Sequence, residues 1–212
     1  MHLPDTVLLD NATGSGLNPV GIGLVVAGAV IAVAGLAAGS RRMTAVETGR
    51  AGMLTAFVFL ASAIHVPIPP AASVHLGLYG LAGILLGKRV LLVSPIAFGL
   101  QALLFGHGGI AAIGLNSVNM SAGALLALGW FRMVGRKRPV VAAFGAGFIG
   151  ILVMAILTLI DLIAVNYSVV VLAAIPGYLA AGVLEGVVTV LVLGTLVKRF
   201  PELLPHPAGK AT

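Results

Sequence analysis

The first two residues of the chain, Met1 and His2, carry a set of nitrogens suited to holding a metal ion. A free terminal amine, the amide nitrogen of His2 and the imidazole Nδ1 of His2 can close small rings of low strain around one cation. A histidine from elsewhere in the chain would complete four nitrogen ligands. Square-planar nitrogen ligation suits Ni²⁺ and Cu²⁺, while imidazole ligation also suits Zn²⁺ or Co²⁺. Because the motif is so short, it is a hypothesis that the rest of the sequence must support.

Three of the other four histidines lie on the side that is predicted to face outward: His65 closes one apolar segment, His75 opens the next, and His107 falls in a break between two segments. His75 is the preferred fourth ligand, because it opens a short apolar segment beside a Pro-rich stretch and can point into a pocket there. His65 and His107 are each more typical of a histidine at a helix end that bonds to backbone or water. The remaining histidine, His206, lies in the C-terminal tail and is expected to be solvated.

Three further polar residues stand out in apolar surroundings. Asn116 and Asn119 begin an apolar segment, where they either cap a helix or orient a ligand histidine from a second shell. Glu185 lies in the middle of another segment. A carboxyl group at membrane depth is a functional candidate by default, although it can also be protonated or pair with a neighbouring helix.

The motifs of several enzyme classes are missing from the sequence. There is no HExxH, GxSxG, P-loop or Rossmann glycine pattern, so neither hydrolysis nor nucleotide binding is indicated. The chain has no cysteine, which excludes disulfides and thiolate metal sites. Any metal ligands must therefore be nitrogen, oxygen or methionine sulfur, and no intrinsic cofactor is expected.

Composition places the chain in a membrane. Of its 212 residues, 59% are hydrophobic and 8% are charged, with a mean hydropathy of +1.14, and a soluble surface of this size needs far more charge. The net charge of +6 does not indicate nucleic-acid binding, because the basic residues are confined to breaks between apolar segments. The start, MHLPDTVLLD, lacks a basic region, so no cleavable signal peptide is expected and Met1 should remain the N-terminus.

Seven apolar segments predict an all-α polytopic membrane protein with seven transmembrane helices in a single transmembrane domain, 1–212. The predicted N-terminal metal-binding segment is 1–18, and the helices are 19–39, 51–66, 74–87, 90–105, 117–131, 139–164 and 168–197. All 12 Lys and Arg residues follow odd-numbered segments. The positive-inside rule then predicts the N-terminus outside and the C-terminus in the cytoplasm.

The segments 74–87 and 90–105 are short, which leaves a re-entrant hairpin over 74–105 as a competing interpretation. That hairpin would bring Lys88 and Arg89 to membrane depth at a cost of about 2.5–3.5 kcal/mol each. Two short spanning helices are favoured. They require the stretch 67–73 to enter the protein as non-helical backbone, which predicts a pocket open to the outside.

Small residues recur four apart along the first segment, a spacing that lets helix backbones approach closely. The pairs are Gly23/Ala27, Gly28/Ala32, Ala34/Ala38 and Gly35/Gly39. They indicate either ordinary packing within the chain or a docking face for another membrane subunit. The loops on the cytoplasmic side are too short to contain an ATPase, so any ATP-driven step would need another chain.

Three stretches together resemble the CbiM/NikM family of substrate-binding membrane subunits of cobalt and nickel energy-coupling-factor (ECF) transporters. They are MHLPD at the start, IHVPIPPAASVHLGLYGLAGILLG at 64–87, and LLFGHGGIAAIGLNSVNM at 103–120. The resemblance covers most of the chain up to about residue 135. The chain has Val74 where the family often has Gly, and His65 where many members have Asn and others have His.

The resemblance implies seven helices around a central pocket that receives the N-terminal segment. It implies that Ni²⁺ or Co²⁺ is the bound and transported ligand, held by the Met1 amine, the His2 amide and imidazole, and His75. His65, His107, Asn116 and Asn119 are implied as further ligands or as support for the site. The implied partners are a transmembrane coupling subunit (CbiQ/NikQ-like), cytoplasmic ATPases (CbiO/NikO-like) and a small membrane subunit (CbiN/NikN-like).

The leading hypothesis is therefore a non-enzymatic component that captures Ni²⁺ or Co²⁺ for ATP-driven uptake, in the cytoplasmic (inner) membrane of a prokaryote. A second hypothesis is a stand-alone ion-coupled secondary metal transporter that uses Glu185, although the sequence contains neither inverted repeats nor paired broken helices. A third, an intramembrane metalloenzyme, is least favoured because no carboxylate lies near the outer histidines in sequence.

Overall fold

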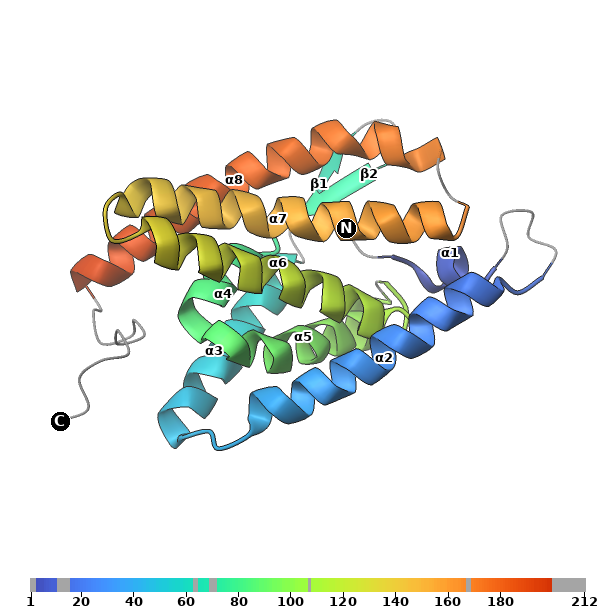
Figure 1. Cartoon of the computed structure of the whole chain (residues 1–212), viewed down its shortest axis with the longest axis horizontal. Helices are drawn as coiled ribbons and strands as arrows, with labels where there is room; N and C mark the ends of the chain where they lie inside the picture. Colours follow the sequence, from blue (N-terminus) through green and yellow to red (C-terminus); the bar gives the residue numbers. More distant parts are fainter. Residues whose placement is uncertain are drawn as a thin grey trace.

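In the computed structural model, a bundle of helices carries one short hairpin of two strands (Figure 1). The structure describes residues 3–10, 16–62, 65–68, 72–106, 108–166 and 169–199, with side chains for all of these except 65–68, 72–75 and 169–174. The elements are α1 (Asp5–Leu9), α2 (Pro19–Ser40), α3 (Ala45–Ser62), β1 (His65–Ile68), β2 (Ala72–His75), α4 (Tyr79–Leu86), the 3₁₀ turn η1 (Gly87–Arg89), α5 (Val90–Phe105), α6 (Ile113–Val134), α7 (Pro139–Ala164) and α8 (Val169–Arg199).

The starts of α2 and α3 follow from local sequence. Asn18 precedes Pro19, and its side-chain oxygen accepts from the backbone N–H groups of Val20 (3.1 Å) and Gly21 (3.2 Å). This is an N-cap followed by proline at the first helical position. At α3, the Thr44 N–H donates to Glu47 (2.9 Å) while the Glu47 N–H donates to the Thr44 hydroxyl (3.2 Å), which forms a capping box.

Each of the seven predicted segments contains a helix. The predictions 19–39, 90–105, 139–164 and 168–197 agree with α2, α5, α7 and α8 to within two residues at each end. The prediction 117–131 lies inside α6, which begins four residues earlier and ends three residues later.

The other two predictions need correction. The segment 51–66 is α3, which starts at Ala45 because the capping box extends the helix into polar sequence, and which ends at Ser62 before a strand. Within the segment 74–87, the α-helical part is limited to the eight residues of α4. His75 does not open this helix, as predicted, but ends β2, because residues 72–75 pair with β1. Of the stretch 67–73 that was predicted as an inward-dipping loop, the described residues 67–68 and 72–73 belong to these two strands.

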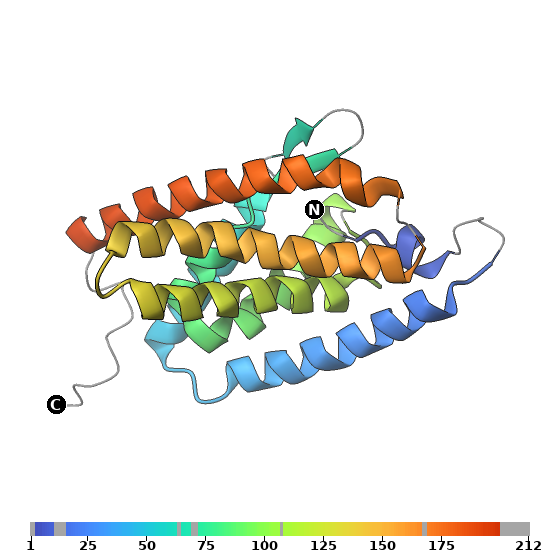
Figure 2. The same cartoon turned by 45° about the horizontal axis from the view of Figure 1, so that its top comes forward.

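By length and composition alone, four helical stretches of the described chain can cross a membrane: Pro19–Ser40, Tyr79–Phe105, Pro139–Ala164 and Ile175–Arg199. The second of these combines α4, η1 and α5. On its own, α4 is about 12 Å long at 1.5 Å per residue, well short of a hydrocarbon core of roughly 30 Å. The hairpin before it lies beside α8 instead of lengthening the helix (Figures 1 and 2).

The helices form two layers. Four long helices, α8, α7, α6 and α2, lie side by side in this order, and α3, α4 and α5 pack behind them (Figure 2). Glycines allow the close crossings in this bundle. A Cβ at Gly83 in α4 would overlap the Ala124 carbonyl of α6, and one at Gly123 in α6 would overlap the Gly150 carbonyl of α7. The central helix α6 is thus held against its neighbours at backbone distance.

The small residues of α2 divide between the two alternatives that the sequence left open. Gly28 and Gly39 are buried, and a Cβ at either would overlap the backbone of α6 or α5. Ala32 and Gly35 are partly buried beside them, so these two pairs pack within the chain. The other two pairs, Gly23/Ala27 and Ala34/Ala38, are exposed in the single chain.

One end of the bundle collects the basic connections. The α2–α3 connection, the α6–α7 connection and the end of α8 lie there, opposite the end that carries α1 (Figures 1 and 2). Arg89 of η1 clamps the α2–α3 connection: its guanidinium donates to the carbonyls of Gly39 (2.8 Å), Arg41 (2.7 Å) and Arg42 (3.3 Å) and pairs with Glu47 at 3.1 Å.

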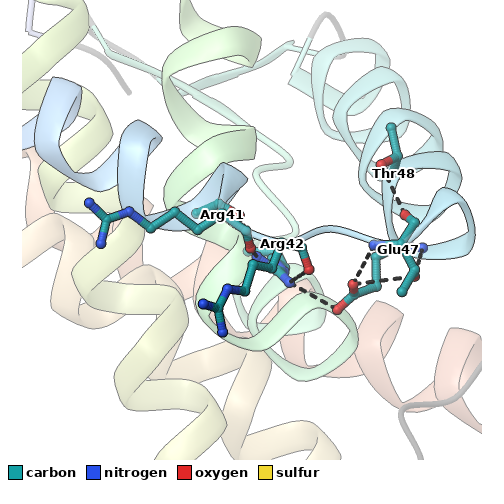
Figure 3. Close-up of polar contacts among 7 residues, drawn as sticks. Arg41, Arg42, Glu47 and Thr48 are labelled. Atoms are coloured by element: carbon teal, nitrogen blue, oxygen red, sulfur yellow. Dashed lines mark hydrogen bonds and ion pairs between the residues drawn. The ribbon is translucent and has the colours of Figure 1, made fainter.

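Glu47, in the first turn of α3, bonds to Thr44 of this connection and to Arg89 (Figure 3). The Thr44 N–H, followed by the Arg89 guanidinium, holds the pKa of Glu47 below its ordinary value. The side chains of Arg41 and Arg42 extend away from Glu47 and are exposed (Figure 3). This end of the protein therefore keeps an exposed positive surface.

Candidate metal-binding site

The chain directly after Met1 and His2 is buried and packed. Leu3 is 1% exposed and Leu8 is 0% exposed, in a cluster that also contains Leu115 and Leu162. A Cβ at Gly21 of α2 would overlap the Leu8 carbonyl, so α1 lies at backbone distance from α2. Leu3 and Leu8 thus belong to the core and hold the start of the chain against the bundle.

The Asp5 carboxylate joins this segment to the loop before α6. It accepts from the backbone N–H of Ala112 at 2.9 Å. Gly109, with φ at +77°, faces the same carboxylate so closely that a Cβ there would overlap it. Gly106 and Gly108 also have positive φ, a backbone that glycine adopts readily. The loop that carries His107 therefore lies against the N-terminal segment.

Asn116 binds the backbone of Leu3 at two points. Its Oδ1 accepts from the Leu3 N–H at 3.0 Å, and its Nδ2 donates to the Leu3 carbonyl at 3.2 Å. Asn116 is 5% exposed and lies in the first turn of α6. The predicted capping role is not what the structure describes: both polar atoms of this side chain are used on the residue that follows His2.

Asn119 has a different partner. Its Nδ2 donates to Oδ2 of Asp161 at 2.7 Å, and both side chains are buried. The bond joins α6 to α7 one turn below Asn116. Asp161 is thus a buried hydrogen-bond partner of Asn119. Asn119 thus supports the helix that carries Asn116 and makes no described contact with the N-terminal segment.

The hairpin brings two candidate histidines into register. β1 and β2 pair antiparallel, with His65 directly opposite His75. Directly opposed positions of an antiparallel pair are neighbours on one face of the ribbon. Sequence reasoning identified both histidines, but the nine residues between them gave no signal strong enough to predict the pairing.

Glu185 is the polar residue whose role the sequence left most open. It is fully buried in α8, and its Oε1 accepts from the backbone N–H groups of Gly77 and Leu78, the latter at 2.7 Å. These residues follow His75 by two and three positions. Its location in mid-helix was visible in the sequence, but its partners depend on how α8 lies beside the hairpin.

The predicted ligands fall at the limits of the described chain. Met1, His2 and His107 lie outside the described residues, and His65 and His75 are described through their backbone alone. Among the side chains that the structure describes, no three His, Cys, Asp or Glu residues come together to hold a metal ion. The ligand set of Met1, His2 and His75 stays a prediction; Asn116 contacts the residue after His2, and Glu185 contacts the backbone two and three residues after His75.

The charge distribution suits a cation on the α1 side. The described Lys and Arg side chains sit in or beside the α2–α3 connection, η1, the α6–α7 connection and the end of α8. Three acidic side chains lie away from these basic groups: Asp5 in α1, Asp161 in the last turn of α7 and Glu185 in the middle of α8. A separation of this kind lowers the electrostatic cost of a divalent cation near the N-terminal segment.

Long apolar helices that cross at glycines, with positive charge gathered at one end, define a multi-pass membrane protein. The chain matches the family model CbiM, described as the cobalt uptake substrate-specific transmembrane region, over residues 20–203, and it belongs to this family. The resemblance read from the three sequence stretches is therefore confirmed.

Several curated proteins are similar to the chain. A Haemophilus influenzae protein assigned to metal transport is 33% identical over 189 residues, which cover 85% of this chain and 91% of that protein. The cobalt transport protein CbiM of Geobacter sulfurreducens is 32% identical over 72% of this chain. The fused nickel transport protein NikMN of Rhodobacter capsulatus is 32% identical over 51% of this chain. The chain spans 48% and 34% of the length of these last two relatives.

Two crystal structures share the fold. They are described as a truncated transition metal transporter and a transition metal transporter, with TM-scores of 0.76 and 0.75. Each covers 93% of this chain, and the chain covers 99% and 93% of theirs. At 24% sequence identity, this likeness concerns the fold alone.

Proposed function

We propose that this chain is the substrate-specific component of an ECF-type ABC importer and captures Ni²⁺ or Co²⁺ for ATP-driven uptake. Membership of the cobalt-uptake family supports the proposal, as do relatives named for cobalt and for nickel transport. The chain itself performs no catalysis in this scheme. ATP hydrolysis takes place in separate subunits.

In this proposal the metal is held by the Met1 amine, the His2 amide nitrogen, the His2 imidazole and His75. The observation that carries the proposal is the two-point hold of Asn116 on Leu3. A chelate built from a terminal amine and the next amide is as mobile as the backbone behind it. Fixing that backbone at the adjacent residue pre-organises the chelate, which is the usual work of groups just outside a metal's ligands.

His65 and His107 are assigned to the surroundings of the metal. The register of β1 and β2 supports a place for His65 next to His75 on the hairpin. The contacts of Asp5 with Gly109 and Ala112 support a place for the His107 loop next to the N-terminal segment. Asn119 acts indirectly, through its bond to Asp161.

A nitrogen-only site favours Ni²⁺ over Co²⁺ by the Irving–Williams order, and it would also bind Cu²⁺. The choice of metal in the cell would then follow availability. The secondary-transporter alternative receives less support, because the sequence contains neither inverted repeats nor paired broken helices. Uptake by vesicles that contain this chain without any ATPase would favour that alternative.

The orientation in this proposal has the N-terminus outside and the basic end in the cytoplasm of a prokaryote, following the positive-inside rule. The partners are a CbiQ/NikQ-like coupling subunit, CbiO/NikO-like ATPases and a CbiN/NikN-like small subunit. The exposed small residues of α2, among them Gly23 and Ala27, offer a face on which a membrane helix can pack closely.

The test is a titration of the purified protein with Ni²⁺ and Co²⁺, comparing the native N-terminus with a variant that carries one extra residue before Met1. The extension converts the terminal amine into an amide, so we expect binding to be lost while the folded protein is retained. Equal binding by the two proteins would contradict the amine–amide–imidazole site. Absence of binding by the native protein would contradict the capture function itself.

A further inference from the structure

Glu185 spans from α8 to the chain that follows His75. Its side chain is 0% exposed, and one oxygen, Oε1, accepts from both the Gly77 and the Leu78 N–H groups. Gly77 and Leu78 are themselves buried. The contact therefore lies in the interior of the protein, on backbone that leads directly from the hairpin into α4.

These two N–H groups need an acceptor from elsewhere because the chain changes from strand to helix at this point. β2 ends at His75, and α4 begins at Tyr79. Leu78 occupies the N-cap position with φ at +52°, and its side chain offers no capping hydrogen bond. Amide groups at a helix start have no partner within the helix. The Glu185 side chain accepts from the N-cap residue Leu78 and from Gly77 just before it, although it comes from a distant part of the sequence.

The position of Glu185 is itself fixed by the packing of three helices. A Cβ at Gly147 of α7 would overlap the backbone carbonyl of Glu185. A Cβ at Gly80 of α4 would overlap the backbone at Ala146 and Gly147. Since α4, α7 and α8 meet at backbone distance here, the backbone of Glu185 is fixed relative to α4 and α7, and its buried side chain extends from there to Gly77 and Leu78.

We propose that Glu185 is a positioning residue for the metal site: it holds the backbone after His75 so that this histidine is presented in one place. This inference rests on the proposed function, in which His75 is a ligand. Glu185 acts on the histidine through Gly77 and Leu78 and is not assigned as a ligand. It matches the action of Asn116 on Leu3, so each half of the proposed ligand set has one buried side chain behind it.

The experiment measures Ni²⁺ affinity of the full chain with its native N-terminus, together with thermal unfolding of the metal-free protein. We expect Glu185→Ala to weaken Ni²⁺ binding by about 10- to 100-fold, the range typical of groups that support metal ligands. Glu185→Gln keeps a carbonyl oxygen for the same two N–H groups, so it should bind within about 3-fold of the wild type, well below that range. Glu47→Gln, which removes a carboxylate at the opposite end, should leave the affinity unchanged.

Three outcomes would overturn the inference. In the first, Glu185→Ala unfolds at a lower temperature but its folded fraction binds Ni²⁺ with wild-type affinity, so the role is purely structural. In the second, Glu185→Gln loses as much affinity as Glu185→Ala, so accepting the two bonds is not what matters. In the third, wild-type protein binds neither Ni²⁺ nor Co²⁺, which removes the proposed function as well.

The alanine variant could fail to fold, because it leaves two buried N–H groups without an acceptor. Glu185→Asp then provides the measurement. It keeps the carboxylate but withdraws it by one methylene group, so the bonds to Gly77 and Leu78 lengthen. We expect a weaker Ni²⁺ affinity for Glu185→Asp than for Glu185→Gln, although Asp keeps the native charge. The reverse order would show that charge, not reach, is what the site uses, and would contradict the positioning role.

Discussion

Asn116 holds the backbone of Leu3 on both sides of its Cα, with its amide oxygen accepting from the Leu3 N–H and its amide nitrogen donating to the Leu3 carbonyl. The two residues are 113 positions apart, and both are buried. An asparagine is suited to this task because its side chain offers a donor and an acceptor side by side. An aspartate would keep the acceptor and lose the donor.

The first prediction concerns this pair. Asn116→Ala should weaken Ni²⁺ binding by about 10- to 100-fold and destabilise the protein by about 1–3 kcal/mol, since it leaves a buried N–H unpaired. Asn119→Ala removes a neighbouring amide that bonds Asp161 instead, so it should cost stability with a much smaller effect on affinity. Calorimetric titration and thermal unfolding of both variants separate these effects. Equal losses of affinity would mean that Asn116 has no special link to the N-terminal segment.

The second prediction separates the two histidines of the hairpin. His75→Ala should abolish binding of Ni²⁺ and Co²⁺, because it removes a proposed ligand. His65→Ala should weaken binding without abolishing it, because His65 is assigned a supporting place opposite His75 in the ladder. The measurement is the metal content of the purified variants after dialysis. If His65→Ala were the variant that lost all metal, the assignments of the two histidines would have to be exchanged.

The sequence was informative wherever one property repeated along a segment. Apolar runs located α2, α5, α7 and α8 to within two residues. They failed at α3, where the capping box of Thr44 and Glu47 continues the helix through polar sequence that hydropathy excludes. The apolar runs also failed to predict the strand at 72–75. A four-residue strand between two helices forms because a partner strand pairs with it, and its own composition does not reveal that pairing.

The candidate site was predictable in its residue types and not in its contacts. Asn116 and Glu185 were singled out because a polar group in an apolar segment is unusual. The hydrogen-bond partner of each side chain lies more than 100 residues away in the sequence and is brought close only by the fold. No local pattern carries that information, so a cap and second-shell support stayed open as alternatives for Asn116, which holds Leu3, and proton coupling was weighed for Glu185, which holds backbone.

The third prediction concerns acid sensitivity at the basic end. Because the folded-state pKa of Glu47 lies below its value of 4.5 in an unfolded chain, its contribution to stability is complete above pH 4.5 and is lost as the pH falls through the folded pKa. Wild type should therefore be more stable than Glu47→Gln at pH 7, and the difference should shrink in acid. Thermal unfolding of both proteins across this pH range tests it, and a difference independent of pH would contradict it.

The fourth prediction concerns the contact of α7 with α8. Gly147→Ala places a methyl group against the Glu185 carbonyl, and we expect a destabilisation of about 1–3 kcal/mol from overpacking. Gly194→Ala in α8 is the matched control, because nothing lies within 4 Å of a Cβ at that position. It should be neutral or slightly stabilising, since alanine favours helix over glycine. Thermal unfolding in one detergent compares the two, and similar losses would argue against a close crossing at Gly147.

The last prediction tests the orientation in the membrane. The chain has no cysteine, so a single introduced cysteine is a unique label site. Gly16 and Lys137 are both exposed, the first just before α2 and the second between α6 and α7. With the N-terminus outside, an impermeant thiol reagent added to intact cells should label Gly16→Cys and spare Lys137→Cys until the membrane is opened. The opposite pattern would reverse the topology, and it would put the proposed metal site on the cytoplasmic side, where it could not capture metal for import.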